Sequence, residues 1–514
     1  MDDKIIVSNR DALKAKYGTA GVAKIKQGIT DLIAADAKRG IKSRLVYLDD
    51  AVAMKSFKGK AVTDPTDARQ NKEAIDAIFK AADPDYLLIL GAPDIVPHQD
   101  MNNPAHTQSD DDPDKFAYGD LPYACDTPYS RDIATFKGPT RVVGRLPDLT
   151  RKVGANGKAT SPDYLVSLLG FAEKFKSYNA ADYGRYFGLS TYSWRKSSEL
   201  SLTNIFGNST EISIAPPKGP THLASVLAPL AHFINCHGGP ADPNFYGEKG
   251  ASQPVSLNSD GIKKRIKPGT VASVECCYGA ELYDSITLGL PLPICQQYLI
   301  QGAYGYFGSS TIAYGPADGN SAADLITQYF LLAVLGGASL GRAALTARQQ
   351  FVEQTGELDP VDLKTLGQFS LLGDPSVVPA LVPSPTGVPK GVDAEQGERQ
   401  ARQQRRAKLR AVGQMLQESK PTASKKARSV RKSETVRKAL SNIAREAGIG
   451  TKREFMAFDV KTPRGARPRG SKAVPVASRY YVAVYLPKKD NLRVAAVAKE
   501  VSGRIVGYRI YTEK

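Results

Sequence analysis

Short apolar strands alternate with helix-like segments over the first three quarters of the chain, and this alternation most constrains the fold. The segment Tyr86-Leu-Leu-Ile-Leu-Gly91 is apolar throughout, which is typical of a parallel strand buried on both faces. Similar strands are expected at residues 5–7, 44–48, 140–145, 231–236, 271–276 and 305–308, with helices at 20–37, 72–82 and 162–178. The alternation predicts an α/β fold with a mainly parallel sheet flanked by helices.

The chain of 514 residues is long enough for two or three domains. Its clearest linker is the Pro- and Gly-rich segment 381–390, where we expect few contacts to cross. We therefore predict an N-terminal α/β subdomain (1–150), a second subdomain (151–382), a basic linker and helix (383–440) and a C-terminal accessory domain (441–514). Strand-like segments at 479–486, 492–498 and 504–511 predict a small α+β domain with an antiparallel meander at the end of the chain.

Basic charge is concentrated in the last quarter of the chain. Residues 391–514 hold 30 Lys and Arg against 11 Asp and Glu, and the whole chain has a net charge of +17. This excess predicts an anionic partner, either an acidic protein or a nucleic acid whose bases could stack on tyrosines. A solvated linker and a meander with tyrosines in its core explain the same pattern. The tyrosines concerned are Tyr480, Tyr481, Tyr485, Tyr508 and Tyr511.

Several features argue against export, membrane insertion and metal binding. The N-terminus carries acidic residues where a signal peptide needs basic ones, and the longest apolar run, near 330–340, is shorter than the ~20 residues that span a bilayer. The five cysteines lack C-x-x-C spacing. The aspartates at 110, 111, 112 and 114 could hold a hard cation, but a solvated surface loop is the favoured interpretation. We expect a cytoplasmic protein without membrane association, metal or cofactor.

Two strand ends carry reactive side chains. His237-Gly238 follows the strand that ends at Cys236, and Cys277 follows the strand that starts at Val271. The carboxyl ends of parallel strands meet at one edge of a sheet. A thiolate nucleophile needs a proton carrier and backbone N–H donors for the oxyanion. Cys277 and His237 are therefore the candidate catalytic pair, although buried cysteines at strand ends also occur for packing alone.

The neighbouring Cys276 is a second candidate nucleophile. Cys277 is favoured because it lies two residues before Gly279, as the nucleophile does in the caspase pattern, whereas Cys276 fits the last buried strand position. A rival site is Gly337-Ala-Ser-Leu-Gly341, which matches a serine nucleophile elbow. That mechanism needs a histidine after the serine, and no histidine follows Ser339. We expect the elbow to be the start of a helix.

Four segments resemble the framework of the gingipain-type cysteine peptidases of the caspase-like clan. They are Pro84-Asp-Tyr-Leu-Leu-Ile-Leu-Gly-Ala-Pro-Asp-Ile-Val-Pro97, Val142-Val-Gly-Arg-Leu-Pro147, Gly308-Ser-Ser-Thr-Ile-Ala-Tyr314 and Phe369-Ser-Leu-Leu-Gly-Asp-Pro-Ser376. The resemblance covers about residues 1–380. It implies a caspase-like fold, with 151–382 as the catalytic subdomain, and peptide-bond hydrolysis by Cys277. His237 would be the general acid, and the N–H groups of Gly238 and Cys277 would form the oxyanion hole.

The same resemblance implies a place for the specificity pocket. Its walls would come from Asp148 and from the turn that contains Ser310 and Tyr314, and an acid there would favour Arg or Lys at the cleavage site. A solvated surface aspartate is the alternative for Asp148. The function predicted is a cysteine endopeptidase acting on protein or peptide substrates, with self-processing within the basic segment 390–437. The alternative is an inactive caspase-like scaffold whose basic tail binds nucleic acid or an acidic partner.

Overall fold

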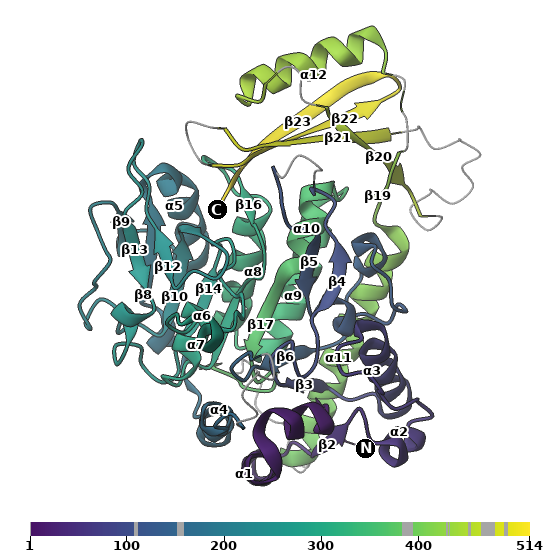
Figure 1. The fold of residues 1–514 in the computed structure, drawn as a ribbon, viewed down its shortest axis with the longest axis vertical. Coiled ribbons are helices and arrows are strands. Elements are labelled where there is room, and N and C mark those ends of the chain that lie inside the picture. Colours follow the sequence, from purple (N-terminus) through teal and green to yellow (C-terminus); the bar gives the residue numbers. More distant parts are fainter. Residues whose placement is uncertain are drawn as a thin grey trace.

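A ten-stranded sheet forms the body of the protein (Figure 1). The structure is a computed structural model that describes residues 2–106, 111–151, 159–382, 394–427, 430, 432–450, 454–463, 478–487 and 492–514. All neighbouring strands of the sheet are parallel except β15 and β17. Across the sheet the strands are β2 (Ser43–Tyr47), β1 (Lys4–Ser8), β3 (Tyr86–Leu90), β6 (Val143–Leu146), β17 (Phe369–Gly373), β15 (Gly305–Ser309), β14 (Val271–Val274), β10 (Ala231–Asn235), β8 (Tyr186–Thr191) and β9 (Ile212–Ala215).

Helices and a second set of short strands surround this sheet. One apolar core contains residues of α1, α3, α4 and α7, and a second contains residues of α5, α8, α9 and α10. The predicted α/β fold with a mainly parallel, helix-flanked sheet is therefore confirmed. The helices of the body are α1 (Arg10–Lys38), α2 (Ala51–Ser56), α3 (Ala68–Ala82), α4 (Asp163–Lys174), α5 (Arg195–Phe206), α6 (Ser285–Leu288), α7 (Ile294–Leu299), α8 (Ala323–Leu335), α9 (Leu340–Thr355) and α10 (Pro360–Gln368). The short strands are β4 (Gln99–Asn102), β5 (Phe116–Gly119), β7 (Tyr178–Asn179), β11 (His237–Gly238), β12 (Asn244–Tyr246), β13 (Val255–Asn258) and β18 (Ala380–Leu381).

The segment that matches a serine nucleophile elbow is the start of α9. The Ser339 side chain accepts a hydrogen bond from the Arg342 N–H and caps the helix. Ser339 is buried, and its hydroxyl is used to satisfy one of the free N–H groups that every helix N-terminus leaves. The expectation of a helix start rather than a nucleophile elbow is confirmed.

A six-stranded sheet lies across one end of the body (Figure 1). The antiparallel meander predicted for the end of the chain is confirmed as β21, β22 and β23. The same sheet includes β16, which comes from the body, and α12 (Glu434–Glu446) covers its outer face. The strand order is β16 (Tyr314–Gly315), β23 (Arg504–Glu513), β22 (Val494–Val501), β21 (Ser478–Tyr485), β20 (Met456–Lys461) and β19 (Thr422–Lys426).

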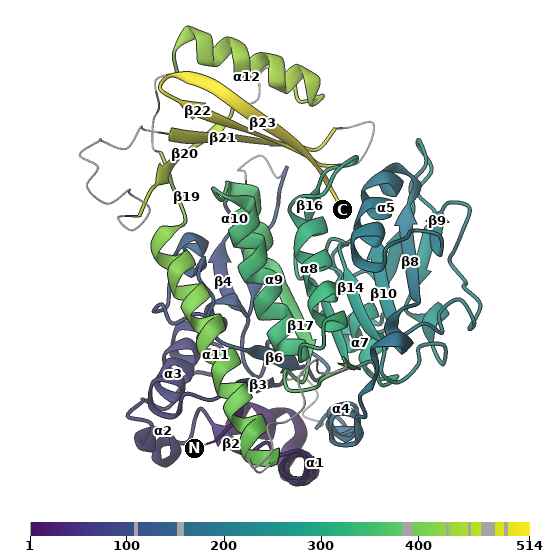
Figure 2. The ribbon, with the colours of Figure 1, turned by 180° about the vertical axis from the view of Figure 1, so that it is seen from behind.

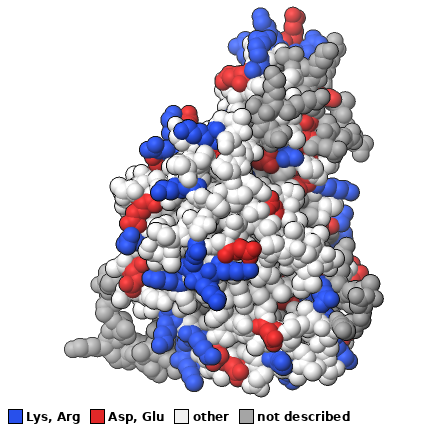
Figure 3. Space-filling model, turned by 60° about the vertical axis from the view of Figure 1, so that its left-hand side comes forward, with Lys and Arg blue, Asp and Glu red and all other residues white. Residues whose placement is uncertain are grey.

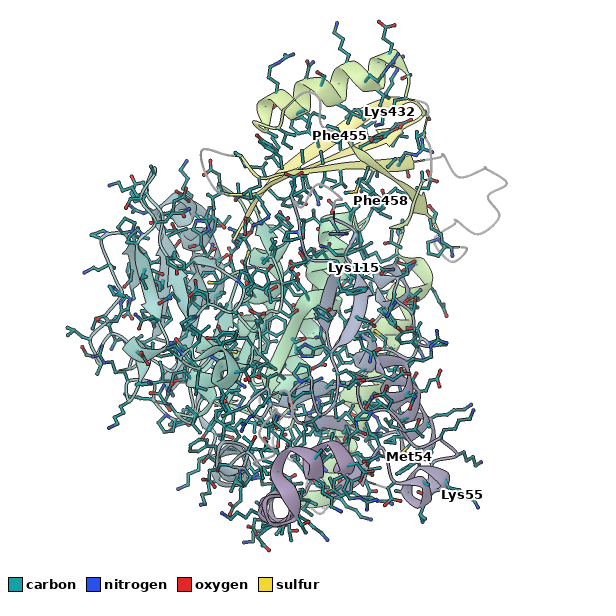
Figure 4. The ribbon with its side chains drawn as sticks, in the orientation of Figure 1. Met54, Lys55, Lys115, Lys432, Phe455 and Phe458 are labelled. Atoms are coloured by element: carbon teal, nitrogen blue, oxygen red, sulfur yellow. The ribbon has the colours of Figure 1, made fainter. Side chains whose placement is uncertain are left out.

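Alternate residues of this sheet face two different cores. Tyr480 and Val482 pack into the core shared with α8, α9 and α10, whereas Tyr481 packs into the core beneath α12. Figure 4 shows the same division, with Phe455 on the α12 side and Phe458 on the side of the body. This is the two-residue period of a strand buried on both faces. The C-terminal sheet is therefore the middle layer between α12 and the body.

The contacts between the body and the C-terminal part are extensive. α11 (Ala394–Ser419) lies along the body beside α9 (Figure 2), and one apolar core continues from α9 into the sheet. The expectation that few contacts cross the linker is therefore wrong. Residues 383–393, which hold most of the predicted linker, lie outside the described residues. The C-terminal sheet begins at Thr422 and its helix at Glu434, both before the predicted boundary at 441.

Surface charge and tyrosine burial bear on the predicted anionic partner. On the face shown in Figure 3, Lys and Arg are interspersed with Asp and Glu. Tyr480, Tyr481 and Tyr511 are buried, and the exposed Tyr508 donates a hydrogen bond to Glu446. The positions of these four tyrosines agree with packing in the core or on the surface and not with base stacking. Among the described residues, no helix has both the length and the apolar character needed to cross a bilayer.

Candidate active site

The two predicted strand ends meet at one edge of the sheet. β10 and β14 are neighbouring parallel strands with Ile234 opposite Val274, so the turns that follow them lie side by side. A Cβ built on Gly238 would lie 2.0 Å from the Cys277 carbonyl oxygen. Only glycine allows this close approach of the two backbones. The structure thus brings His237, Gly238 and Cys277 together.

Cys277 and Cys276 have different surroundings, although both are buried. The Cys276 sulfur accepts a hydrogen bond from the Cys236 N–H at 3.4 Å. Cys276 packs in the core that contains residues of α1, α3, α4 and α7, whereas Cys277 packs in the core that contains residues of α5, α8, α9 and α10. The Cys277 sulfur lies beside Ala313, whose N–H donates to it at 3.1 Å. The next residue, Tyr278, has a φ of 53°, which is uncommon for a residue other than glycine and marks a constrained turn.

His237 has an acidic partner that the sequence did not reveal. Its Nε2 lies 3.1 Å from a carboxylate oxygen of Glu248, while its buried Nδ1 has no hydrogen-bond partner among the described residues. The Glu248 backbone is held by the Ala215 carbonyl and the Thr191 hydroxyl. A carboxylate on one ring nitrogen fixes the orientation of the imidazole and leaves the other nitrogen for proton transfer. The only sequence feature that could have indicated Glu248 as the partner of His237 is its position as an acid two residues after β12.

The last residue of the sequence, Lys514, lies against Cys277. The Cys277 N–H donates to the Lys514 carbonyl oxygen at 2.8 Å, and the Lys514 N–H donates to the Ala313 carbonyl oxygen at 3.0 Å. The two preceding residues pair antiparallel with β16, Glu513 opposite Tyr314 and Thr512 opposite Gly315. Figure 1 shows the C-terminus between the second sheet and the body, next to β16. The end of β23 therefore lies in an extended conformation along the candidate nucleophile.

The Lys514 side chain enters a buried acidic site, which we call the lysine site. Its ammonium nitrogen lies 3.2 Å from Asp324 and 3.9 Å from Glu275 and donates to the Pro316 carbonyl at 3.1 Å. The same nitrogen lies 4.6 Å from the centre of the Trp194 ring. Both carboxylates and the lysine are fully buried. The lysine site consists of Trp194, Glu275, Gly315, Pro316 and Asp324.

Hydrogen bonds fix the two carboxylates of the lysine site. Ser197 donates to Asp324, and Thr327 donates to Glu275 at 3.2 Å. Burial, and then the charge of Asp324, raise the pKa of Glu275 well above its ordinary value. The neighbouring charge of Asp324 therefore favours the protonated form of Glu275. The positive charge of a lysine side chain between these two groups offsets the buried negative charge.

The pKa of the Cys277 thiol is affected by burial and by Glu513 of β23. Burial, and then the negative charge of Glu513, raise the pKa of Cys277 well above the ordinary thiol value. Glu513 is itself paired with Arg493 at 2.8 Å. With Lys514 in place, Cys277 is fully buried and protonated. The candidate nucleophile is covered by the chain's own C-terminal strand.

The three predicted pocket residues have different positions. Tyr314 lies at the site, because its backbone pairs with Glu513 and its hydroxyl donates to Asp112 at 2.9 Å. Ser310 donates to the Tyr118 carbonyl and lines a separate cavity of about 700 Å³ together with His98 and Glu281.

Asp148 is not brought to the lysine site. It is buried, not a solvated surface aspartate: it pairs with Lys16 at 2.8 Å and accepts hydrogen bonds from the Tyr17 hydroxyl and the Ala92 N–H. Sequence reasoning missed Trp194, Glu275 and Asp324, which contact Lys514 instead.

The acidic loop is a support for the site rather than a solvated segment. Asp112 is fully buried and pairs with Lys364 at 2.7 Å, and Asp114 accepts hydrogen bonds from the Tyr278 hydroxyl and the Ile312 N–H. The expectation of a solvated loop is wrong for these residues because they satisfy buried donors around Cys277. Asp110 lies outside the described residues. Within the described part of the chain, no group of three or more His, Cys, Asp or Glu side chains is arranged to hold a metal ion.

Comparisons with known proteins show only distant similarity. No family model and no curated protein matches the chain. A solved chain titled "Structure of Protease" has 14% identity and a TM-score of 0.47, with 99% of this chain and 97% of that chain covered. Separase in the Saccharomyces cerevisiae separase–securin complex has 13% identity and a TM-score of 0.26, with 46% of this chain and 14% of that chain covered. The function of the protein must therefore be argued from its own residues.

Proposed function

We propose that the protein is a gingipain-type cysteine endopeptidase that cleaves peptide bonds after lysine. The observation that carries the proposal is the position of Lys514, whose carbonyl accepts the Cys277 N–H while its ammonium group lies between buried carboxylates. Lys514 thus occupies the place of P1, the residue on the amino side of a cleaved bond. The resemblance of the framework segments to gingipain-type peptidases adds independent support.

The reaction follows from the geometry around Cys277. The Cys277 thiolate attacks the P1 carbonyl carbon, and the carbonyl oxygen becomes an oxyanion that the Cys277 N–H stabilises. The protonated His237 gives its proton to the leaving amine, and the C–N bond breaks to leave an acyl-enzyme. Water then adds to the thioester and releases the carboxylate product and the thiol. Glu248 orients the imidazole and stabilises its charged form throughout.

The lysine site favours lysine over arginine and over neutral side chains. The terminal nitrogen of Lys514 reaches Asp324 and the Pro316 carbonyl. The Lys514 side chain packs directly against Gly315, where a Cβ atom would lie 2.3 Å from Lys514 Cε. An arginine would have to place a larger planar group with five donors where the compact lysine ammonium lies. A neutral side chain of the same length leaves the charge of the carboxyl pair buried without a partner.

Fluorogenic peptides with Lys, Arg or norleucine at P1 test the proposal. They are offered to the wild type and to the Lys514→Ala variant, whose lysine site is free of the chain's own lysine. We expect hydrolysis in the order Lys, Arg, norleucine, with loss of activity in Cys277→Ala and retention in Cys276→Ala. If neither protein with Cys277 intact hydrolyses any peptide, the proposal fails and the inactive caspase-like scaffold is favoured. Cleavage with no preference for lysine would overturn the assignment of the lysine site.

A further inference from the structure

The groups that a substrate strand would need are occupied by β23. An extended peptide adds to an exposed strand through its backbone, and here the available strand is β16. β23 already pairs with β16, and Lys514 already uses the Ala313 carbonyl and the Cys277 N–H. A substrate with lysine at P1 requires the same hydrogen bonds and the same lysine site. Substrate and C-terminal strand cannot bind together.

The C-terminal strand is held near the site by the rest of its sheet. Arg493 donates to the Asp111 carbonyl and pairs with Glu513, and the buried Tyr511 donates to Asp359. The inner face of the sheet shares an apolar core with α8, α9 and α10. Such anchoring keeps the end of β23 at an effective local concentration on the order of millimolar. A free peptide at lower concentration competes poorly with it.

Only the last residues of the chain need to move to free the site. The pairing of β23 with β16 covers two residue pairs, whereas its pairing with β22 covers eight. Withdrawal of residues 512–514 also gives up the Thr512–Val494 pair and the contacts of Glu513 with Arg493, but it leaves seven of the eight pairs between β22 and β23 in place. Local opening of this kind requires much less free energy than global unfolding. The arrangement provides a closed state and an accessible open state of one active site.

We propose that the C-terminal strand Arg504–Glu513, together with Lys514, is an intramolecular inhibitor that occupies the active site as a peptide would. Substrate enters only when residues 512–514 are withdrawn from Cys277 and the lysine site. That this strand inhibits catalysis rests on the proposed function. That Lys514 occupies the site beside Cys277 does not depend on that function. The hydrogen bond from the Cys277 N–H to the Lys514 carbonyl and the burial of Cys277 support it.

The decisive experiment compares Lys514→Ala with the wild type and with Arg504→Ala. Arg504 is an exposed basic residue at the other end of β23, so its variant controls for the loss of one positive charge. Two readouts are used: the rate at which iodoacetamide alkylates Cys277, mapped by mass spectrometry, and kcat/KM for a peptide with lysine at P1. We expect both to rise at least about tenfold in Lys514→Ala and to stay at the wild-type level in Arg504→Ala.

A second arm uses Trp194, the only tryptophan of the sequence, which lies 4.6 Å from the Lys514 ammonium group. Lys514→Ala should change the tryptophan emission, and the synthetic peptide Arg-Ile-Tyr-Thr-Glu-Lys, copied from residues 509–514, should restore it and slow alkylation. Equal alkylation rates and equal emission in wild type and Lys514→Ala would overturn the inference, even if peptides are cleaved. Faster alkylation without any peptide cleavage would instead support the occupancy and reject the proposed function.

Discussion

The Cys277 N–H donates a 2.8 Å hydrogen bond to the carbonyl oxygen of Lys514. This distance is within the range expected between an oxyanion-hole donor and the oxygen on which charge develops. The Lys514 N–H donates in turn to the Ala313 carbonyl, so the backbone of Lys514 is held at both its N–H and its carbonyl oxygen. The candidate oxyanion donor is therefore identified by an occupant rather than by resemblance alone. For Gly238, the second predicted donor, the structure provides the close approach to Cys277.

Replacement of the nucleophile is the first prediction. Cys277→Ala should lower kcat by at least about 10³-fold, because no other attacking group is proposed. Cys276→Ala should keep most of the activity, since the Cys276 sulfur lies in the apolar core and contacts the Cys236 N–H. The measurement is single-turnover hydrolysis of a lysyl peptide, with thermal unfolding as a check on the fold. Turnover at the wild-type rate in Cys277→Ala would show that Cys277 is not the nucleophile.

The orientation of His237 gives the second prediction. Glu248→Gln keeps the size of the side chain but removes the negative charge 3.1 Å from Nε2, so the imidazolium is less stable and proton transfer slows. We expect kcat to fall by roughly 10- to 100-fold, a part of what general acid catalysis contributes, with KM little changed. Glu211→Gln is the matched control, because Glu211 pairs with Arg185 on the surface. A loss confined to KM would contradict the positioning role.

The framework and the candidate catalytic pair could be predicted because each depends on local sequence. Apolar runs such as residues 86–91 are strands whose burial follows from composition, and neighbouring parallel strands bring their following residues to one edge. His237 and Cys277 are found in this way. The N-cap role of Ser339 follows from its position before a helical segment.

The lysine site could not be predicted because its residues come from separate elements. Trp194 precedes α5, Glu275 follows β14 and Asp324 lies in α8, and only the fold brings them to the Lys514 side chain. The resemblance implied Asp148 as a pocket wall because it lies in the loop after Gly144-Arg145, but in the structure Asp148 is paired with Lys16 and hydrogen-bonded to Tyr17. No sequence signal indicates which of two buried acids already has a partner in the folded chain.

Asp324 gives the third prediction. Asp324→Asn removes the charge that lies 3.2 Å from the lysine ammonium, an interaction of about 1.5–3 kcal/mol for a hydrogen bond to a charged group. We expect kcat/KM for lysyl peptides to fall by roughly 10- to 100-fold while the ratio of norleucine to lysine cleavage rises. The assay is carried out in the Lys514→Ala background, so that release of the C-terminal strand is not measured as well. Unchanged selectivity would exclude Asp324 from the specificity site.

Gly315 gives the fourth prediction. A Cβ built on Gly315 would lie 2.3 Å from Lys514 Cε and 2.7 Å from Asp324, so Gly315→Ala should narrow the lysine site. We expect cleavage after lysine to be lost and tryptophan emission to change as Lys514 is displaced. Gly319→Ala is the control, because the nearest atom to its Cβ is 4.0 Å away. Equal lysyl peptide hydrolysis in the two variants would mean that substrates bind elsewhere.

The fifth prediction concerns pH and Glu275. Its pKa in the folded protein is raised well above the ordinary 4.5, so the folded state holds a proton that the unfolded state releases as pH increases. Between these two pKa values the unfolded state binds fewer protons, and the free energy of unfolding must fall as pH rises. Glu275→Gln mimics the protonated side chain and removes this dependence. Urea unfolding at pH 5 and pH 8 should therefore show a smaller loss of stability at pH 8 in Glu275→Gln than in wild type. A parallel decline in both proteins would show that Glu275 is ionised in the folded state, and the carboxyl pair would then carry two negative charges beside Lys514.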